Sequence, residues 1–84
     1  MSDIGRLARM PEVDIIFDVR GWHQAAPRMR ELRAKLGQAG LAPMSSAIVS
    51  GKRGLGDRLR VTCRFRYASE AEAEQATIIG AMLV

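Results

Sequence analysis

Cysteine, histidine and aromatic residues are scarce in this sequence of 84 residues. There is one cysteine, Cys63, and one histidine, and aromatic residues make up 5% of the chain. A single cysteine excludes an intramolecular disulfide and a metal site built from several thiolates. Much of the 48% hydrophobic content is alanine, which predicts a thin core. We therefore expect one small domain over residues 1–84, whose stability depends partly on self-association.

Long apolar runs are also missing. The longest, residues 78–84, is far too short to span a bilayer. Residues 1–10 lack the apolar run and cleavage site of a signal peptide, and they could form a short helix or a mobile basic arm. The sequence thus predicts a cytoplasmic protein with no membrane partner.

Positive charge is plentiful. The net charge is +4, and the basic residues are 11 arginines and two lysines. Arginine suits bidentate contacts to phosphate or carboxylate. Two interpretations follow: a nucleic-acid partner, or arginines neutralised by carboxylates on neighbouring strands or subunits.

Three segments have the properties of β-strands. Residues 58–67 alternate strictly between apolar and polar side chains, which predicts a half-buried strand with one arginine face. Residues 12–20 alternate in the same way, while residues 44–50 form a weaker strand with ambiguous alternation, followed by a flexible loop over residues 51–57. The predicted centre of the core is the inward face of residues 58–67: Leu59, Val61, Cys63, Phe65 and Tyr67.

Two segments have the properties of helices. Residues 25–36 carry one apolar stripe at helical spacing, with Gly37 as a plausible C-cap. Ser69 is a good N-cap for a helix from Glu70 to near Met82. Gly80 is unfavourable inside a helix, so a short helix followed by a strand over residues 77–84 is the alternative.

The order strand, helix, strand, strand, helix predicts an α+β fold. A helical crossover followed by a hairpin places the third strand between the other two, giving an antiparallel sheet of order 1-3-2 with both helices on one face. This is a ferredoxin-like sandwich truncated before its last strand, and the first strand is left as an open edge. The same order puts Asp14 and Asp18 beside Arg60, Arg64 and Arg66 on the outer face.

Residues 67–76, Tyr-Ala-Ser-Glu-Ala-Glu-Ala-Glu-Gln-Ala, resemble the junction between the third strand and second helix of RNA-recognition motifs. The resemblance implies the same strand-to-helix topology. The base-stacking aromatic positions of that family would fall at Thr62 and Arg64, which are not aromatic. The resemblance therefore supports the fold and does not imply that family's RNA site.

No nucleophile–base arrangement is visible, and His23 has no second ligand at metal spacing. We therefore expect no enzyme activity, catalytic residue, cofactor or metal. The favoured function is a small protein–protein interaction module, such as an accessory protein, that forms a homo-oligomer, with a dimer as the first expectation. The interface would use Ile15, Ile16, Phe17, Ile78, Ile79, Met82 and Leu83.

Nucleic-acid binding is the alternative function. It would use the arginine face of the sheet and the basic hairpin loop, because clustered cations bind phosphates. Trp22 is a further candidate contact residue, because a half-exposed tryptophan anchors interfaces well. The candidate residues for nucleic acid or another partner are Lys52, Arg53, Arg58, Arg60, Arg64, Arg66 and Trp22.

Overall fold

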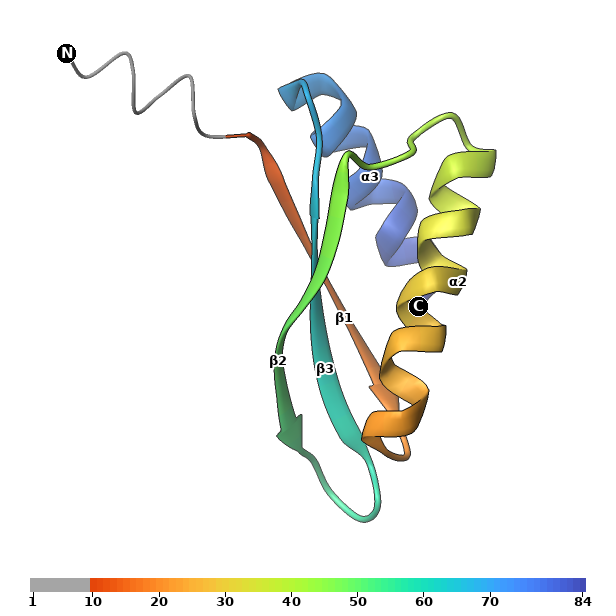
Figure 1. Cartoon of the computed structure of the whole chain (residues 1–84), viewed down its shortest axis with the longest axis vertical. Helices are drawn as coiled ribbons and strands as arrows, with labels where there is room; N and C mark the ends of the chain where they lie inside the picture. The colour runs from red at the N-terminus through yellow and green to blue at the C-terminus, as the bar shows by residue number, and fades with distance from the viewer. Residues whose placement is uncertain (1–9) are drawn as a thin grey trace, which may run out of the picture.

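The computed structural model describes residues 10–84, and the predicted N-terminal arm lies almost wholly outside them. Three strands form one sheet and both helices cover the same face of it (Figure 1). The α+β class and the β-α-β-β-α order are as predicted. The elements are β1 (Glu12–Val19), η1 (Trp22–Gln24), α2 (Ala25–Gln38), β2 (Ser45–Arg53), β3 (Leu59–Arg66) and α3 (Glu70–Leu83).

The sheet has the predicted order β1-β3-β2, with both pairs antiparallel. Along β1 and β3 the register pairs inward residues with inward residues, for example Val13 with Phe65 and Phe17 with Val61. Their outward neighbours are polar except for Ile16, so one face of the sheet is apolar and the other is mainly charged. The predicted core centre is confirmed, since all five inward residues from Leu59 to Tyr67 are buried.

The sequence offers two glycines for the end of this helix, Gly37 as a C-cap and Gly40 as a second break, and α2 ends at the second of them. Gly37 lies inside the helix, and the turn that ends it is made by Gly40, whose φ is +80°. The Gly40 N–H donates to the Gly37 carbonyl at 3.0 Å, and the Leu41 N–H donates to the Leu36 carbonyl at 2.8 Å. This pair of bonds is a Schellman motif, which needs a residue in the left-handed region and therefore favours glycine at position 40. Leu41 and Leu36 are both buried, which adds the usual apolar contact.

β2 is longer than predicted, and its loop is correspondingly shorter. The strand continues through Gly51 to Arg53, because Lys52 pairs with Arg60 and Gly51 pairs with Val61. The register shifts between Ile48 and Ser50, which is a β-bulge. One extra residue reverses the alternation within the strand. Ser46 and Ile48 before the bulge and Gly51 after it are half-buried, so no single alternation describes the whole strand.

α3 is a helix through to Leu83, so the alternative of a strand over residues 77–84 is excluded. The Ser69 side chain accepts a hydrogen bond from the Glu72 N–H at 3.2 Å, as expected of an N-cap. Gly80 is buried where α3 packs on β1, and a Cβ there would stand 2.5 Å from Ile15 Cδ1. The glycine that argued against the helix is the residue that lets the helix approach the sheet.

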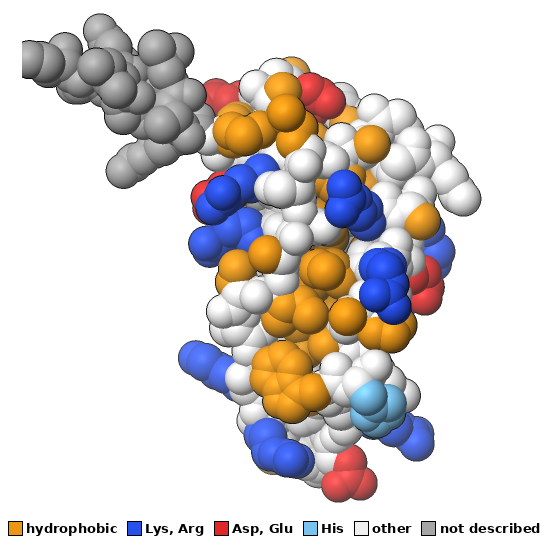
Figure 2. All heavy atoms as spheres, viewed as in Figure 1, with side chains coloured by type: hydrophobic (Ala, Val, Ile, Leu, Met, Phe, Trp, Pro, Cys, Tyr) orange, Lys and Arg blue, Asp and Glu red, His pale blue; other side chains and the backbone are white. Residues whose placement is uncertain are grey.

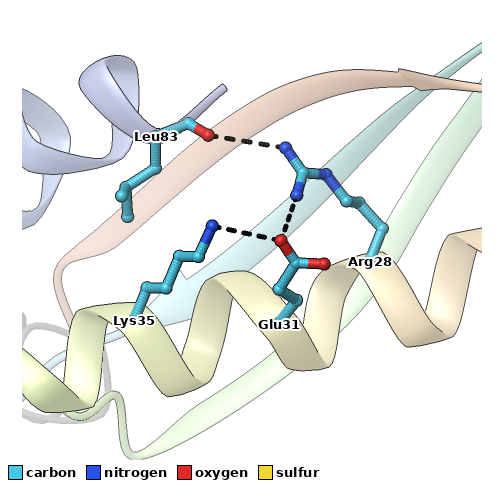
Figure 3. Close-up of polar contacts among 4 residues, drawn as sticks. All are labelled: Arg28, Glu31, Lys35 and Leu83. Carbon is cyan, nitrogen blue, oxygen red and sulfur yellow. Dashed lines mark hydrogen bonds and ion pairs between the residues drawn. The ribbon is translucent and has the colours of Figure 1, made fainter.

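Arg28 connects the two helices at the C-terminal end of α3 (Figure 3). Its guanidinium donates to the Leu83 carbonyl at 3.4 Å and lies 2.6 Å from the Glu31 carboxylate. Lys35 reaches the same carboxylate at 3.1 Å. The Lys35 hydrogen bond, followed by the charge of Arg28, lowers the pKa of Glu31 below its ordinary value. A cation beside the last carbonyls of a helix is the favourable arrangement for the helix dipole.

Candidate interaction surfaces

The outer face of the sheet carries ion pairs between β1 and β3. The Arg64 side chain contacts both carboxylate oxygens of Asp14, at 2.9 and 3.1 Å, which is a bidentate contact. Arg60 Nε lies 3.2 Å from Asp18 Oδ1. The register places these partners directly opposite each other. The predicted contacts of Asp14 and Asp18 with arginines are therefore present.

Two of the acidic residues hold a second arginine. The Glu12 carboxylate contacts Arg64 at 3.2 Å and Arg66 at 3.3 Å, and Arg58 approaches Asp18 to 3.9 Å. All of these side chains are partly or largely exposed, so each pair contributes little to stability. Their main effect is to neutralise the positive charge of these arginines. The chain's own carboxylates occupy the arginines in the middle of this face, which leaves them less available to a phosphate partner.

The end of the β2–β3 hairpin is different. Lys52 and Arg53 are exposed, and within residues 10–84 neither has an ion-pair partner. Leu55 at the apex is 96% exposed. Figure 2 shows basic side chains on both sides of this end of the molecule, near the single histidine. The predicted binding residues thus divide into a neutralised group on the sheet face and a free group at the hairpin.

Trp22 and His23 lie in η1, between β1 and α2. The Trp22 ring rests on Gly51 of β2 so closely that a Cβ at Gly51 would overlap it, yet the side chain remains 57% exposed. Trp22 therefore covers β2 at Gly51. Figure 2 shows a strip of hydrophobic side chains that runs between β2 and α2. His23 lines a hollow of about 910 Å³ between the end of β1, the start of α2 and the hairpin loop.

The free edge of β1 can be identified from the hydrogen-bond pattern. The Tyr67 N–H donates to the Pro11 carbonyl at 3.0 Å, in register with the ladder that pairs Glu12 with Arg66. Hydrogen-bonded and non-hydrogen-bonded pairs alternate in an antiparallel ladder, so odd-numbered residues of β1 bond to β3. The even-numbered residues turn their N–H and C=O groups away from β3, towards the open edge: Glu12, Asp14, Ile16 and Asp18.

The predicted interface residues fall into three groups. Three of them are exposed: Ile16 on β1, and Ile78 and Met82 on α3. The exposed fraction of Met82 is 79%. Ile79 and Leu83 pack partly against the core. Two predicted members offer nothing to the interface, because their side chains are buried in the chain's own core and their peptide groups bond to β3: Ile15 and Phe17.

A residue that sequence reasoning missed is Val84. It is half exposed and shares a hollow of about 320 Å³ with Ile16 of β1. The hollow lies between the end of α3 and the edge of the sheet, and charged side chains line it as well: Asp18, Arg28 and Arg60. No local sequence pattern could have shown this, because the two residues are far apart along the chain and meet only after α3 packs on β1.

Cys63 is not a nucleophile in this fold. Its side chain is buried in the sheet, and burial raises the pKa of the thiol from 9.0 to about 11. The thiolate is the reactive form of cysteine, and it is almost absent near neutral pH. Within residues 10–84 there is also no group of three or more His, Cys, Asp or Glu side chains that could hold a metal ion.

Comparisons of the chain with protein-family models, curated proteins and solved structures give no match. Between residues 10 and 84, neither helix is long and apolar enough to cross a membrane. The geometry of the surfaces is therefore the basis for the functional argument.

Proposed function

We propose that this chain is a non-catalytic interaction module that works as a homodimer, joined through the free edge of β1. The proposal rests on the free edge of β1, which is eight residues long. Every second residue of the strand directs its N–H and C=O groups away from β3, towards this edge. Such an edge is a ready template for another strand. At its end the Arg20 N–H is satisfied by the Gln24 side chain at 2.9 Å, so the open part ends with β1 itself.

The other edge, β2, is protected in ways that β1 is not. β2 contains a bulge after Ile48 and carries Lys52 and Arg53, and both features discourage edge-to-edge pairing. β1 has no bulge in its pairing with β3 and no lysine, arginine or proline between Glu12 and Val19. Its acidic residues are balanced by the arginines of β3. Pairing through β1 is therefore the less obstructed route.

A second copy of the chain fits this edge. Antiparallel pairing about a twofold axis at Ile16 overlaps the two strands over residues 13–19 and extends the sheet from three strands to six. Ile16 would meet its own copy on the outer face. Asp14 would lie opposite the second chain's Asp18, and each already carries an arginine, Arg64 or Arg60. The repulsion between them is reduced accordingly.

The same axis brings two α3 helices together on the other face of the sheet, because α3 packs on β1. Its exposed apolar residues, Ile78, Met82 and Val84, would then be shared between the two copies. Together with Ile16, they make up four of the exposed large hydrophobic residues found between residues 10 and 84. Burial of this surface would also compensate for the thin core.

Light scattering coupled to size exclusion at micromolar concentration tests the proposal. We expect the wild-type chain to elute as a dimer and Ile16→Lys as a monomer, because two lysines would lie directly opposite each other at the axis and repel. Val49→Lys is the matched control, since Val49 is an exposed β-branched residue on the opposite edge strand. A wild-type chain that remains monomeric, or equal dissociation by both variants, would contradict the proposal.

Amide hydrogen exchange gives an independent readout. The Ile16 N–H points to the free edge, so it should exchange quickly in the monomer and slowly in the dimer. The Ile15 N–H bonds to β3 and should be protected at every concentration. We expect the exchange of the Ile16 N–H to become slower as the protein concentration rises. Rapid exchange of this N–H at all concentrations would contradict the proposed dimer.

A further inference from the structure

Part of the positive charge that has no close acidic partner lies at the hairpin end of the molecule. Arg60 is held by Asp18 at 3.2 Å, whereas Arg58 only approaches the same carboxylate to 3.9 Å. Lys52 and Arg53, on the other strand of the hairpin, have no acidic partner among residues 10–84. The hairpin end therefore carries cations that the fold itself does not use.

These cations surround a hollow of about 470 Å³. The two strands of the hairpin contribute to it from both sides, and Gly54 forms part of its wall. Its charged lining consists of four cations and one carboxylate: Lys52, Arg53, Arg58, Arg60 and Asp18. An excess of cations at a concave surface attracts anions and raises their local concentration.

The surface continues beyond this hollow. Arg58 and Leu55 also line the larger hollow of about 910 Å³ on the other side of the loop, where Arg20 adds another cation. The larger hollow also contains three carboxylates, those of Asp18, Glu31 and Asp57, which balance its cations. The excess of positive charge therefore lies on the Lys52 and Arg53 side of the loop, where four cations face one carboxylate. Arginine, the commonest cation here, forms bidentate contacts with phosphate.

Leu55 is the apex of the loop, between Gly54 and Gly56, and is almost fully exposed. An apolar side chain flanked by cations is the arrangement with which many proteins contact nucleic-acid bases while holding the backbone. A lipid surface is the competing partner for such a loop. A single leucine offers too little apolar surface for that, since even one myristoyl chain gives only marginal membrane binding.

From these observations we infer that the β2–β3 hairpin end binds the sugar–phosphate backbone of a nucleic acid. Lys52, Arg53 and Arg58 contact phosphates, and Leu55 contacts the sugars or bases beside them. The site lies at the far end of β3 from Glu12 and does not depend on the β1 edge. Its binding therefore survives in the monomeric variant Ile16→Lys.

Fluorescence anisotropy with a short mixed-sequence DNA, as a duplex and as a single strand, and with an RNA of the same sequence tests the inference. The measurements are made at about 50 and 200 mM salt, because phosphate contacts release counterions. We expect Lys52→Ala/Arg53→Ala to lower the affinity at least about tenfold at the lower salt. The slope of log affinity against log salt should fall by about two.

Arg30→Ala/Arg33→Ala is the matched control. It removes the same charge from exposed positions on α2, and it should change the affinity by less than about threefold. Leu55→Ser should weaken binding without changing the salt slope, since leucine makes no ionic contact. Equal loss in the two double variants, full affinity of Leu55→Ser, or no binding at the lower salt would overturn the inference. Binding to anionic vesicles without binding to nucleic acid would overturn it in favour of a lipid surface.

Discussion

Gly80 of α3 lies against Ile15 of β1 at a distance that leaves no room for a side chain. A Cβ at position 80 would stand 2.5 Å from Ile15 Cδ1 and 3.1 Å from Ile15 Cγ1. Ile15 is buried in the core, so its side chain cannot swing out into solvent. The contact sets how closely α3 sits on the strand whose free edge is the proposed dimer interface.

Replacement of Gly80 by alanine should therefore destabilise the fold, although alanine is the better helix former by about 1 kcal/mol. Overpacking a core typically costs about 1–3 kcal/mol, so the net loss should be about 1 kcal/mol. Removing Cδ1 with Ile15→Val should relieve the clash. In urea unfolding, the double variant Gly80→Ala/Ile15→Val should be more stable than the sum of the single effects predicts. Strict additivity would mean that this contact does not limit the packing.

Tyr67 is the largest fully buried side chain, and its hydroxyl donates to the Leu41 carbonyl at 2.7 Å. Tyr67→Phe keeps the ring but leaves that carbonyl without its donor, so the free energy of unfolding should fall by about 1–3 kcal/mol. Urea midpoints measure the loss. Because Leu41 ends the Schellman motif of α2, exchange of the Leu41 N–H should also become faster. An unchanged midpoint would show that water replaces the hydroxyl at this position.

The buried thiol of Cys63 predicts a loss of stability at alkaline pH. Its pKa is raised from 9.0 to about 11, so the folded state keeps a proton that the unfolded state has lost. The contribution is fully present below pH 9 and is lost as the pH rises towards 11. Burial also raises the pKa of Tyr67, which adds a loss in the same direction at higher pH.

Urea midpoints between pH 8 and 11 test this expectation. The wild-type midpoint should fall more steeply than that of Cys63→Ala, which has no thiol to ionise. The alanine variant will be less stable at every pH because of the cavity, so the comparison rests on the slopes and not on the absolute values. Parallel curves would show that Cys63 does not contribute to the pH dependence.

Trp22 is the only tryptophan in the chain, so its fluorescence reports on its contact with Gly51. Gly51→Ala should push the ring outward, because a methyl group would occupy its position. We expect a red-shifted emission maximum and a stability change under about 1 kcal/mol, since the ring is already more than half exposed. Gly54→Ala on the same hairpin should leave the emission unchanged. A shift of equal size in both variants would contradict the contact.

Much of the fold could be predicted because alternation along a strand is a local property. In β3 every second residue from Leu59 to Phe65 faces the core, and that pattern needs no knowledge of the partner strands. The sheet order follows from connection lengths, and it places Asp14 and Asp18 on the outer face beside the arginines of β3, whereas the register decides which residues pair. The ion-paired part of the candidate site was therefore accessible from the sequence.

Other features depended on contacts between distant residues. Gly80 has a low helix propensity, and only its approach to Ile15 explains why the helix keeps it. The bulge after Ile48 arises from pairing with β3, so it is invisible in the alternation of β2 alone. Whether a glycine ends α2 at position 37 or 40 depends on where Leu41 can be buried.

The sequence by itself thus determined the faces of β1 and β3, the order of the elements from β1 to β3, and the excess of positive charge. Only the tertiary structure decided which of those charges are free and which apolar residues remain uncovered. The physical reason is that pairing and burial are relations between residues far apart in the chain. Arg64 and Arg53 look alike in the sequence, and they differ only because β1 brings Asp14 to the first and nothing comparable to the second.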